Sequence, residues 1–192
     1  MNTRHFPAGE KVATTLFLVR HTPVNISKGT CYGSTDAPLD EPQFAASLPT
    51  IHLQLPLRAV MRCSPLSRCL QLARALHKLS TERLLTVAPE LVERDFGRWE
   101  GRDWNHVPRD QIDAWAANYL HYSPPDGESV ALMASRTVAA LTLALRNKTT
   151  DAPLIIISHA GPLAAICAHL SGVDLHVNTV SAALGSVTTL RL

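Results

Sequence analysis

Short apolar runs alternate along this chain with longer segments whose apolar residues recur at helical spacing. The strand-like runs lie at 16–20, 58–63, 84–88, 154–157 and 185–192. Helices are predicted at 44–55, 64–79, 108–119, 128–146 and 162–170. Because strands alternate with helices, we expect an α/β fold, a three-layer α/β/α sandwich built on a mostly parallel sheet.

Several local patterns refine this expectation. The run L-I-I-I at 154–157 is β-branched and uniformly apolar, which is typical of a parallel strand covered on both faces. Ser64 followed by Pro65 predicts a helix start with the serine hydroxyl as its cap. Pro49 is expected to cut the helix at 44–55 short. Segment 22–43 reads as a long, shaped polar connection, and segment 89–105 as an ordered loop with short helical turns.

Composition bounds the class of protein. A chain of 192 residues favours one domain, here 14–192, preceded by a polar, loosely held tail at 1–13 that lacks a signal-peptide pattern. No apolar run reaches membrane-spanning length. The net charge of +2 is too small for a nucleic-acid footprint, but a few local arginines could still bind a small anion. Homodimers are the commonest assembly, and the sequence leaves the oligomeric state open.

Cysteine and histidine spacing argues against a metal centre. The four cysteines match no zinc or redox pattern, so we expect reduced thiols and a cytoplasmic protein. The nine histidines include no HExxH and no clustered ligand spacing, so no metal is expected. The three tryptophans are interpreted as packing residues.

Chemistry-bearing residues follow three of the predicted strands. Arg20 and His21 end the first strand, Arg68 lies one helical turn beyond the second, and His159 follows the L-I-I-I run. Because the carboxyl ends of parallel strands meet at one edge of a sheet, we expect these side chains to converge. Guanidinium forks match phosphate oxygens, and a helix N-terminus offers free N–H groups. The set predicts a pocket for a phosphate ester.

The same set could carry catalysis. A neutral imidazole nitrogen can attack phosphorus to give a phosphohistidine, which water then hydrolyses. That reaction needs a group that first protonates the leaving alkoxide and then activates water, and Glu93 is the candidate. Taken one at a time, each of these residues has a structural interpretation: a hydrogen-bonded histidine, a solvated arginine, a loop carboxylate. Only the combination favours a site.

Four motifs in the chain resemble those of the histidine phosphatase superfamily, which has the phosphoglycerate-mutase-like fold. L-F-L-V-R-H-T-P resembles LxxVRHG, and C-S-P-L-S-R-C-L-Q-L-A resembles SPLxRAxxTA. L-V-E-R-D-F-G-R-W-E-G resembles LxExxFGxWEG, and I-I-I-S-H-A-G-P resembles VSHGG. The four occur in the expected order and span most of the chain.

The resemblance implies a role for each matching position. His21 would be the phosphorylated nucleophile and Glu93 the proton donor and later the base. Arg20, Arg68 and His159 would hold the phosphoryl group, without metal or organic cofactor. Two positions depart from the family pattern, since Thr22 and Ala160 stand where glycine is frequent.

Two further stretches resemble the α-ribazole phosphatase branch of the superfamily, which acts in cobalamin biosynthesis. They are P-V-N-I-S-K-G-T-C-Y-G-S-T-D-A-P-L and P-P-D-G-E-S. That branch implies α-ribazole 5′-phosphate as the substrate. The 22–39 loop would read the leaving group. The candidates for binding substrate are Ser27, Cys31, Tyr32, Gly33 and Ala160. The open alternatives are a phosphatase of broader range, a phosphoglycerate mutase and a phospho-ligand-binding module without catalysis.

Overall fold

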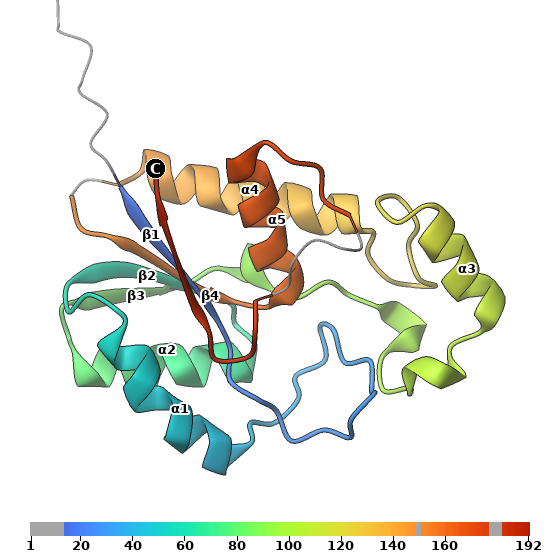
Figure 1. Cartoon of the computed structure of the whole chain (residues 1–192), viewed down its shortest axis with the longest axis horizontal. Helices are drawn as coiled ribbons and strands as arrows, with labels where there is room; N and C mark the ends of the chain where they lie inside the picture. The colour runs from blue at the N-terminus through green and yellow to red at the C-terminus, as the bar shows by residue number, and fades with distance from the viewer. Residues whose placement is uncertain (1–13, 149–150, 177–181) are drawn as a thin grey trace, which may run out of the picture.

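One mixed sheet lies at the centre of the structure, a computed structural model that describes residues 14–148, 151–176 and 182–192 (Figure 1). Its strands are β1 (Thr15–Arg20), β2 (Ala59–Cys63), β3 (Arg83–Val87), β4 (Leu154–Ser158) and β5 (Val187–Arg191). They lie in the order β3-β2-β4-β1-β5. Strands β1 to β4 run parallel, and β5 pairs antiparallel with β1 at an edge. The predicted sheet is confirmed, and the L-I-I-I run is part of its fully buried central strand.

Helices cover both faces of this sheet (Figure 1). On one face lie α1 (Glu41–Leu53) and α2 (Ser67–Leu79), and on the other α4 (Val130–Arg146) and α5 (Ala160–Ser171). Successive residues of β4 point to opposite faces. Ile155 therefore joins a buried cluster with Leu72 of α2, and Ile156 joins another with Leu141 and Ile166. These two cores confirm the three-layer sandwich.

An irregular segment between β3 and α4 forms a side structure rich in aromatic residues. It contains the short 3₁₀ turns η1 (Pro89–Leu91), η2 (Gly97–Trp99) and η3 (Trp104–His106), followed by α3 (Arg109–Ala117). The prediction of an ordered loop with short helical turns is confirmed. Its core packs against the 22–43 segment, because Cys31 is buried with Trp99 and Val107 in one cluster.

The prediction that Pro49 ends a helix is wrong. Helix α1 begins earlier, at Glu41, where the Asp40 carboxylate accepts a hydrogen bond from the Gln43 N–H at 3.1 Å. It then runs through Pro49 to Leu53. The reason is tertiary packing, since Phe44 and Ile51 on the two sides of the proline both contact the core cluster under the sheet.

The predicted start of α2 is also wrong. The helix begins at Ser67, and its first N–H is capped from outside by Asp36, whose carboxylate accepts from both the backbone N–H and the hydroxyl of Ser67 at 2.8 Å. Ser64 is completely buried, and its hydroxyl accepts from the N–H of Leu66 at 3.3 Å, just before the helix, as well as from His159 in the network described below. The predicted tail at 1–13 lies outside the described residues. No helix in the described part of the chain is long and apolar enough to span a bilayer.

Replacing Pro49 by alanine should stabilise the protein. A proline in a helix interior costs about 3 kcal/mol through its lost hydrogen bond and its clash with the preceding turn. Part of this cost is offset because proline also restricts the unfolded chain, so we expect the free energy of unfolding to rise by about 1–2 kcal/mol. Urea denaturation measures the change.

Pro42→Ala is the matched control, because Pro42 lies in the first turn of α1, where its missing N–H has no intrahelical partner to lose. We expect this variant to change stability by less than about 1 kcal/mol. Equal effects at the two positions, or a loss of stability in Pro49→Ala, would contradict the account of a strained helix held by packing.

Candidate active site

Three neighbouring parallel strands end at one place. In the register of the sheet, Arg20 of β1 lies opposite Ser158 of β4, and Cys63 of β2 lies opposite Ile157. The residues that follow these positions, His21, Ser64 and His159, are all buried. Because β2, β4 and β1 are neighbours in the sheet, the residues predicted at the ends of these separate strands lie close together.

One hydrogen bond of the His21 side chain fixes its tautomer. The side chain is 2% exposed, and its Nδ1 lies 2.7 Å from the carbonyl oxygen of Thr22. A carbonyl can only accept, so Nδ1 carries the proton and Nε2 of the neutral ring keeps its lone pair. Because any residue at position 22 supplies this carbonyl, the departure from glycine at Thr22 leaves the interaction intact.

The surroundings of His21 keep the ring neutral. Burial is the main cause that lowers the pKa of His21 to about 3, and the charges of Arg68 and Arg20 lower it further, against the hydrogen bond to Thr22, which raises it. At neutral pH the unprotonated Nε2 is therefore available as a nucleophile.

His159 lies against His21 and is tied to Arg68. The two imidazole centroids are 5.1 Å apart. Nδ1 of His159 accepts a hydrogen bond from Nε of Arg68 at 3.2 Å, so its proton is on Nε2, which donates to the hydroxyl of Ser64 at 2.8 Å. Burial, followed by the charge of Arg68, lowers the pKa of His159 well below its usual value, which agrees with a neutral ring.

Arg68 is fully buried at the start of α2 and also binds the 22–43 segment. Its Nη1 donates to the carbonyl of Thr35 at 2.7 Å and its Nη2 to the carbonyl of Gly33 at 2.6 Å. With the bond to His159, three of the five guanidinium N–H groups are used. Two remain for a ligand at the pocket that Arg68 lines.

Glu100 holds the loop that supplies those carbonyls. Its carboxylate accepts hydrogen bonds from the backbone N–H and the hydroxyl of both Ser34 and Thr35, and from the N–H of Phe96. Burial alone would raise the pKa of Glu100, but the hydrogen bonds from Thr35, Phe96 and Ser34 together hold it below its usual value. The ionised carboxylate thus fixes Gly33 and Thr35 in front of Arg68.

Glu93 lines the same pocket. Its Oε1 accepts from the N–H of Arg94 at 2.9 Å, and its Oε2 accepts from the N–H of Gly161, in the first turn of α5, at 3.2 Å. A Cβ on Gly161 would lie only 2.4 Å from Glu93 Oε1. The close approach of the carboxylate to α5 therefore requires glycine at 161, and alanine at 160 leaves it undisturbed.

These groups border a cavity of about 150 Å³. The residues that line it are Arg20, His21, Thr30, Cys31, Tyr32, Gly33, Arg68, Glu93, Phe96 and Trp104. Cys31 is no competing nucleophile at neutral pH, because burial, with the charges of Glu100 and Glu93, raises the pKa of its thiol to about 12.

Not every predicted site residue borders the cavity. His159 lies behind Arg68 and His21, with both ring nitrogens already bonded within the protein. Ala160 follows it as the first residue of α5, and Ser27 is exposed on the 22–43 segment. None of these three is among the lining residues.

Two residues that line the cavity, Trp104 and Phe96, are not among the site residues predicted from the sequence. The sequence pattern indicates packing for Trp104 and gives Phe96 no role. The Trp104 ring meets Phe96 edge to face, with centroids 5.3 Å apart, and both line the same cavity as His21. Their segment is fastened to the 22–43 loop, since the N–H of Trp104 donates to the Gly29 carbonyl at 2.9 Å. The available signal was the density of aromatic and charged residues without helical period at 96–104.

A buried histidine, His21, thus lies with Arg20 at the end of β1 and Arg68 at the start of α2 around one cavity at the carboxyl edge of an α/β sheet. Comparison with known proteins identifies the family. Residues 16–192 match the family model of the histidine phosphatase superfamily (branch 1), and the chain belongs to that family.

Relatives and solved structures agree with this assignment. The chain is 31% identical over 170 residues to the adenosylcobalamin/alpha-ribazole phosphatase of Salmonella typhimurium, covering 81% of this chain and 78% of that protein. It is 30% identical over 165 residues to the Escherichia coli protein of the same name, covering 82% and 79%. Bacillus stearothermophilus YhfR has the same fold, with a TM-score of 0.78 at 21% identity over 92% of this chain and 90% of that one. A mycobacterial glucosyl-3-phosphoglycerate phosphatase gives a TM-score of 0.74 at 21% identity over 92% and 89%.

The neutral state of His21 predicts a pH dependence of stability. The pKa of His21 is lower in the folded protein than in the unfolded chain. On acidification the unfolded chain therefore binds a proton at His21 that the folded protein does not bind. The free energy of unfolding then falls as the pH drops below about 6.5. Between pH 7 and pH 5 this linkage costs about 2 kcal/mol for one such histidine. Urea denaturation of the wild type and His21→Gln at both pH values measures it.

The variant lacks this one titrating group and should therefore lose about 2 kcal/mol less than the wild type over the same interval. His77→Gln is the control, because His77 is only partly buried and lies outside the site. An identical loss in wild type and His21→Gln would mean that His21 is protonated in the folded protein near its ordinary pKa.

Proposed function

We propose that this protein hydrolyses a small phosphate monoester through a phosphohistidine formed on Nε2 of His21. The observation that carries the proposal is the bond from Nδ1 of His21 to the Thr22 carbonyl, because it leaves the Nε2 lone pair on a buried, neutral ring beside Arg20 and Arg68. The two remaining N–H groups of Arg68 would bind the phosphoryl oxygens in the same cavity.

The reaction would run in two steps. Nε2 of His21 attacks phosphorus, the ester P–O bond breaks, and the Glu93 carboxyl protonates the leaving alkoxide. The Glu93 carboxylate then takes a proton from water, whose oxygen attacks the phosphoryl group. The P–N bond breaks, phosphate leaves and the neutral imidazole returns. In this scheme His159 positions Arg68 by accepting its Nε–H.

We propose α-ribazole 5′-phosphate as the substrate. The two curated relatives, at 31% and 30% identity, are both named adenosylcobalamin/alpha-ribazole phosphatase. The leaving group would be a ribose that carries a flat dimethylbenzimidazole. Tyr32, Phe96 and Trp104 give the mouth of the cavity three aromatic rings, and such rings favour stacking with a flat aromatic body.

A comparison of substrates tests this proposal. Phosphate release is measured from α-ribazole 5′-phosphate, ribose 5-phosphate, phosphoserine and a nucleoside 5′-monophosphate, with wild type, His21→Ala and Trp104→Ala. We expect kcat/KM to be highest for the ribazole ester. His21→Ala should abolish every activity, and Trp104→Ala should lower kcat/KM for the ribazole ester about 10-fold, from the loss of roughly 1–1.5 kcal/mol of stacking, while leaving ribose 5-phosphate nearly unchanged.

The outcomes separate the parts of the proposal. A flat substrate profile that His21→Ala abolishes would keep the phosphohistidine chemistry and discard the ribazole substrate. Activity that survives His21→Ala would refute the mechanism. Equal losses on all substrates in Trp104→Ala would assign Trp104 to packing.

The role of Glu93 predicts a dependence on the leaving group. Glu93→Gln cannot donate a proton, so turnover of an alkyl phosphate should fall by roughly 10²–10⁴, whereas 4-nitrophenyl phosphate, whose leaving group needs no proton, should lose far less in its first step. Burst-phase release of nitrophenol isolates that step. Glu90→Gln is the matched control, since Glu90 is an exposed carboxylate three residues away. Equal losses on both esters would count against proton donation by Glu93.

A further inference from the structure

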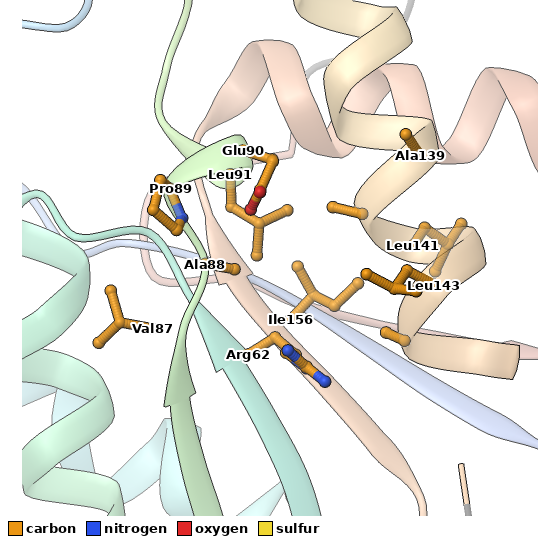
Figure 2. A pocket seen from close by; sticks show the side chains of 12 residues that line it. Arg62, Val87, Ala88, Pro89, Glu90, Leu91, Ala139, Leu141, Leu143 and Ile156 are labelled. Carbon is orange, nitrogen blue, oxygen red and sulfur yellow. The ribbon is translucent and has the colours of Figure 1, made fainter. Parts of the chain in front are cut away.

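A second, larger cavity of about 300 Å³ lies on the face of the sheet covered by α4 (Figure 2). We call it the α4 groove. Its lining residues are Arg62, Val87, Ala88, Pro89, Glu90, Leu91, Ala139, Ala140, Leu141, Leu143, Ala144 and Ile156. None of them borders the pocket that holds His21, so the groove is a separate site.

The walls of the α4 groove are apolar. Leu91, Leu141 and Ile156 are buried and form its deeper surface, while Leu143 is 56% exposed and Val87 43% exposed at its margin. The volume reaches the lower end of the range for small-molecule sites. The groove would thus accept a compact apolar body rather than a long chain.

Arg62 and Glu90 are the two charged residues in this otherwise apolar lining. Arg62 is the next-to-last residue of β2, in register with Ile156 of β4 and Thr86 of β3, and its side chain lies at one end of the groove near Ile156 (Figure 2). Its Nε is buried and has no hydrogen-bond partner among the described residues. Arg62 takes part in none of the three ion pairs between described residues.

The buried Nε–H is the costly part of this guanidinium. A buried donor without an acceptor typically costs about 1–3 kcal/mol, and more when it is charged. The planar fork of arginine is suited to two parallel hydrogen bonds from a carboxylate. No described residue of the lining accepts a hydrogen bond from Arg62, so the outer N–H groups of its guanidinium remain available to a carboxylate that a ligand brings.

We propose that the α4 groove binds a small monocarboxylate with a compact apolar body. The carboxylate pairs with Arg62 and the apolar part packs against Leu91, Leu141 and Leu143. Glu90 stands at the opposite side of the groove with its carboxylate toward the interior (Figure 2). The negative charge of Glu90 disfavours binding of a dianion such as a phosphate ester. The monocarboxylate proposed for the α4 groove thus differs in charge from the phosphate ester proposed for the His21 pocket.

A small ligand fits these observations better than a second copy of the chain. The edge strand β3 could pair with another β3, but such pairing runs along the strand edge and brings no acceptor to Arg62, which lies on the neighbouring strand β2 under α4. The proposal stands independently of the phosphatase function.

The test uses hexanoate as the probe and hexan-1-ol as its uncharged counterpart. Both are titrated into the full chain while backbone amide NMR shifts are followed. We expect hexanoate to shift amides of 62, 87–91, 139–144 and 156 with a Kd on the order of 1 mM, and hexan-1-ol to bind at least about 10-fold more weakly. Arg62→Met, which keeps an unbranched apolar stem but removes the guanidinium, should weaken hexanoate about 10-fold and leave hexan-1-ol unchanged.

Two variants serve as controls. Arg58→Met removes an exposed arginine four residues before Arg62 and should leave hexanoate binding unchanged. Ala139→Trp fills the groove while Arg62 stays in place, and should abolish the shifts caused by both probes. A correctly folded Ala139→Trp thus tests the site even if Arg62→Met fails to fold.

Three results would overturn the proposal. Equal affinities for hexanoate and hexan-1-ol would show that Arg62 recognises no carboxylate. Shifts scattered outside the groove, or an equal loss in Arg58→Met, would indicate binding elsewhere. A dimer in analytical ultracentrifugation that Ala139→Trp dissociates would mean that the groove is covered by a second copy of the chain.

Discussion

A fully buried guanidinium, that of Arg68, organises the candidate active site. Removing a cation from water is expensive, and among the described residues no carboxylate pairs with Arg68 to compensate. Its partners are neutral acceptors, two backbone carbonyls and one imidazole nitrogen. A cation held in this way keeps most of its field for an anion that arrives later, which is the electrostatic condition for binding a phosphoryl group.

The rest of the site is arranged around this cation. Glu100 fixes the loop whose carbonyls face Arg68, and Asp36 of the same segment caps the helix on which Arg68 lies. His159 can accept from Arg68 only because its other nitrogen donates to Ser64. The charge of Arg68 in turn adds to the burial that keeps His21 neutral. The positive field that would bind phosphate thus also preserves the lone pair that would attack it.

The sequence predicted those parts of the structure that depend on local pattern. The L-I-I-I run identified the central strand, and Arg20, His21, Arg68 and Glu93 could be placed at one edge because parallel strands share their carboxyl ends. Contacts between distant segments could not be read in the same way. Ser64 has the local signature of a helix cap, yet it accepts from His159, 95 residues away. The local pattern around Trp104 indicates only a packing residue, and its position at the pocket depends on its contact with the 22–43 loop.

Pro49 shows the same limit in the backbone. Its local effect is to break a helix, but burial of Phe44 and Ile51 on either side of it stabilises the continuous helix. The motif resemblance located most of the site without knowledge of these contacts, because the motifs of a family reflect the tertiary structure that its members share. It did not reveal that His159 lies behind the cavity rather than on its wall.

The most direct test of the account is to trap the intermediate. The protein is mixed with a ³²P-labelled phosphate monoester, quenched in alkali, digested and analysed by mass spectrometry. The account predicts one phosphoryl group per chain, on the peptide that contains His21, stable in alkali and lost in acid, and absent from His21→Ala. A label on another residue, or rapid turnover without any labelled enzyme, would contradict the proposal that His21 is the nucleophile.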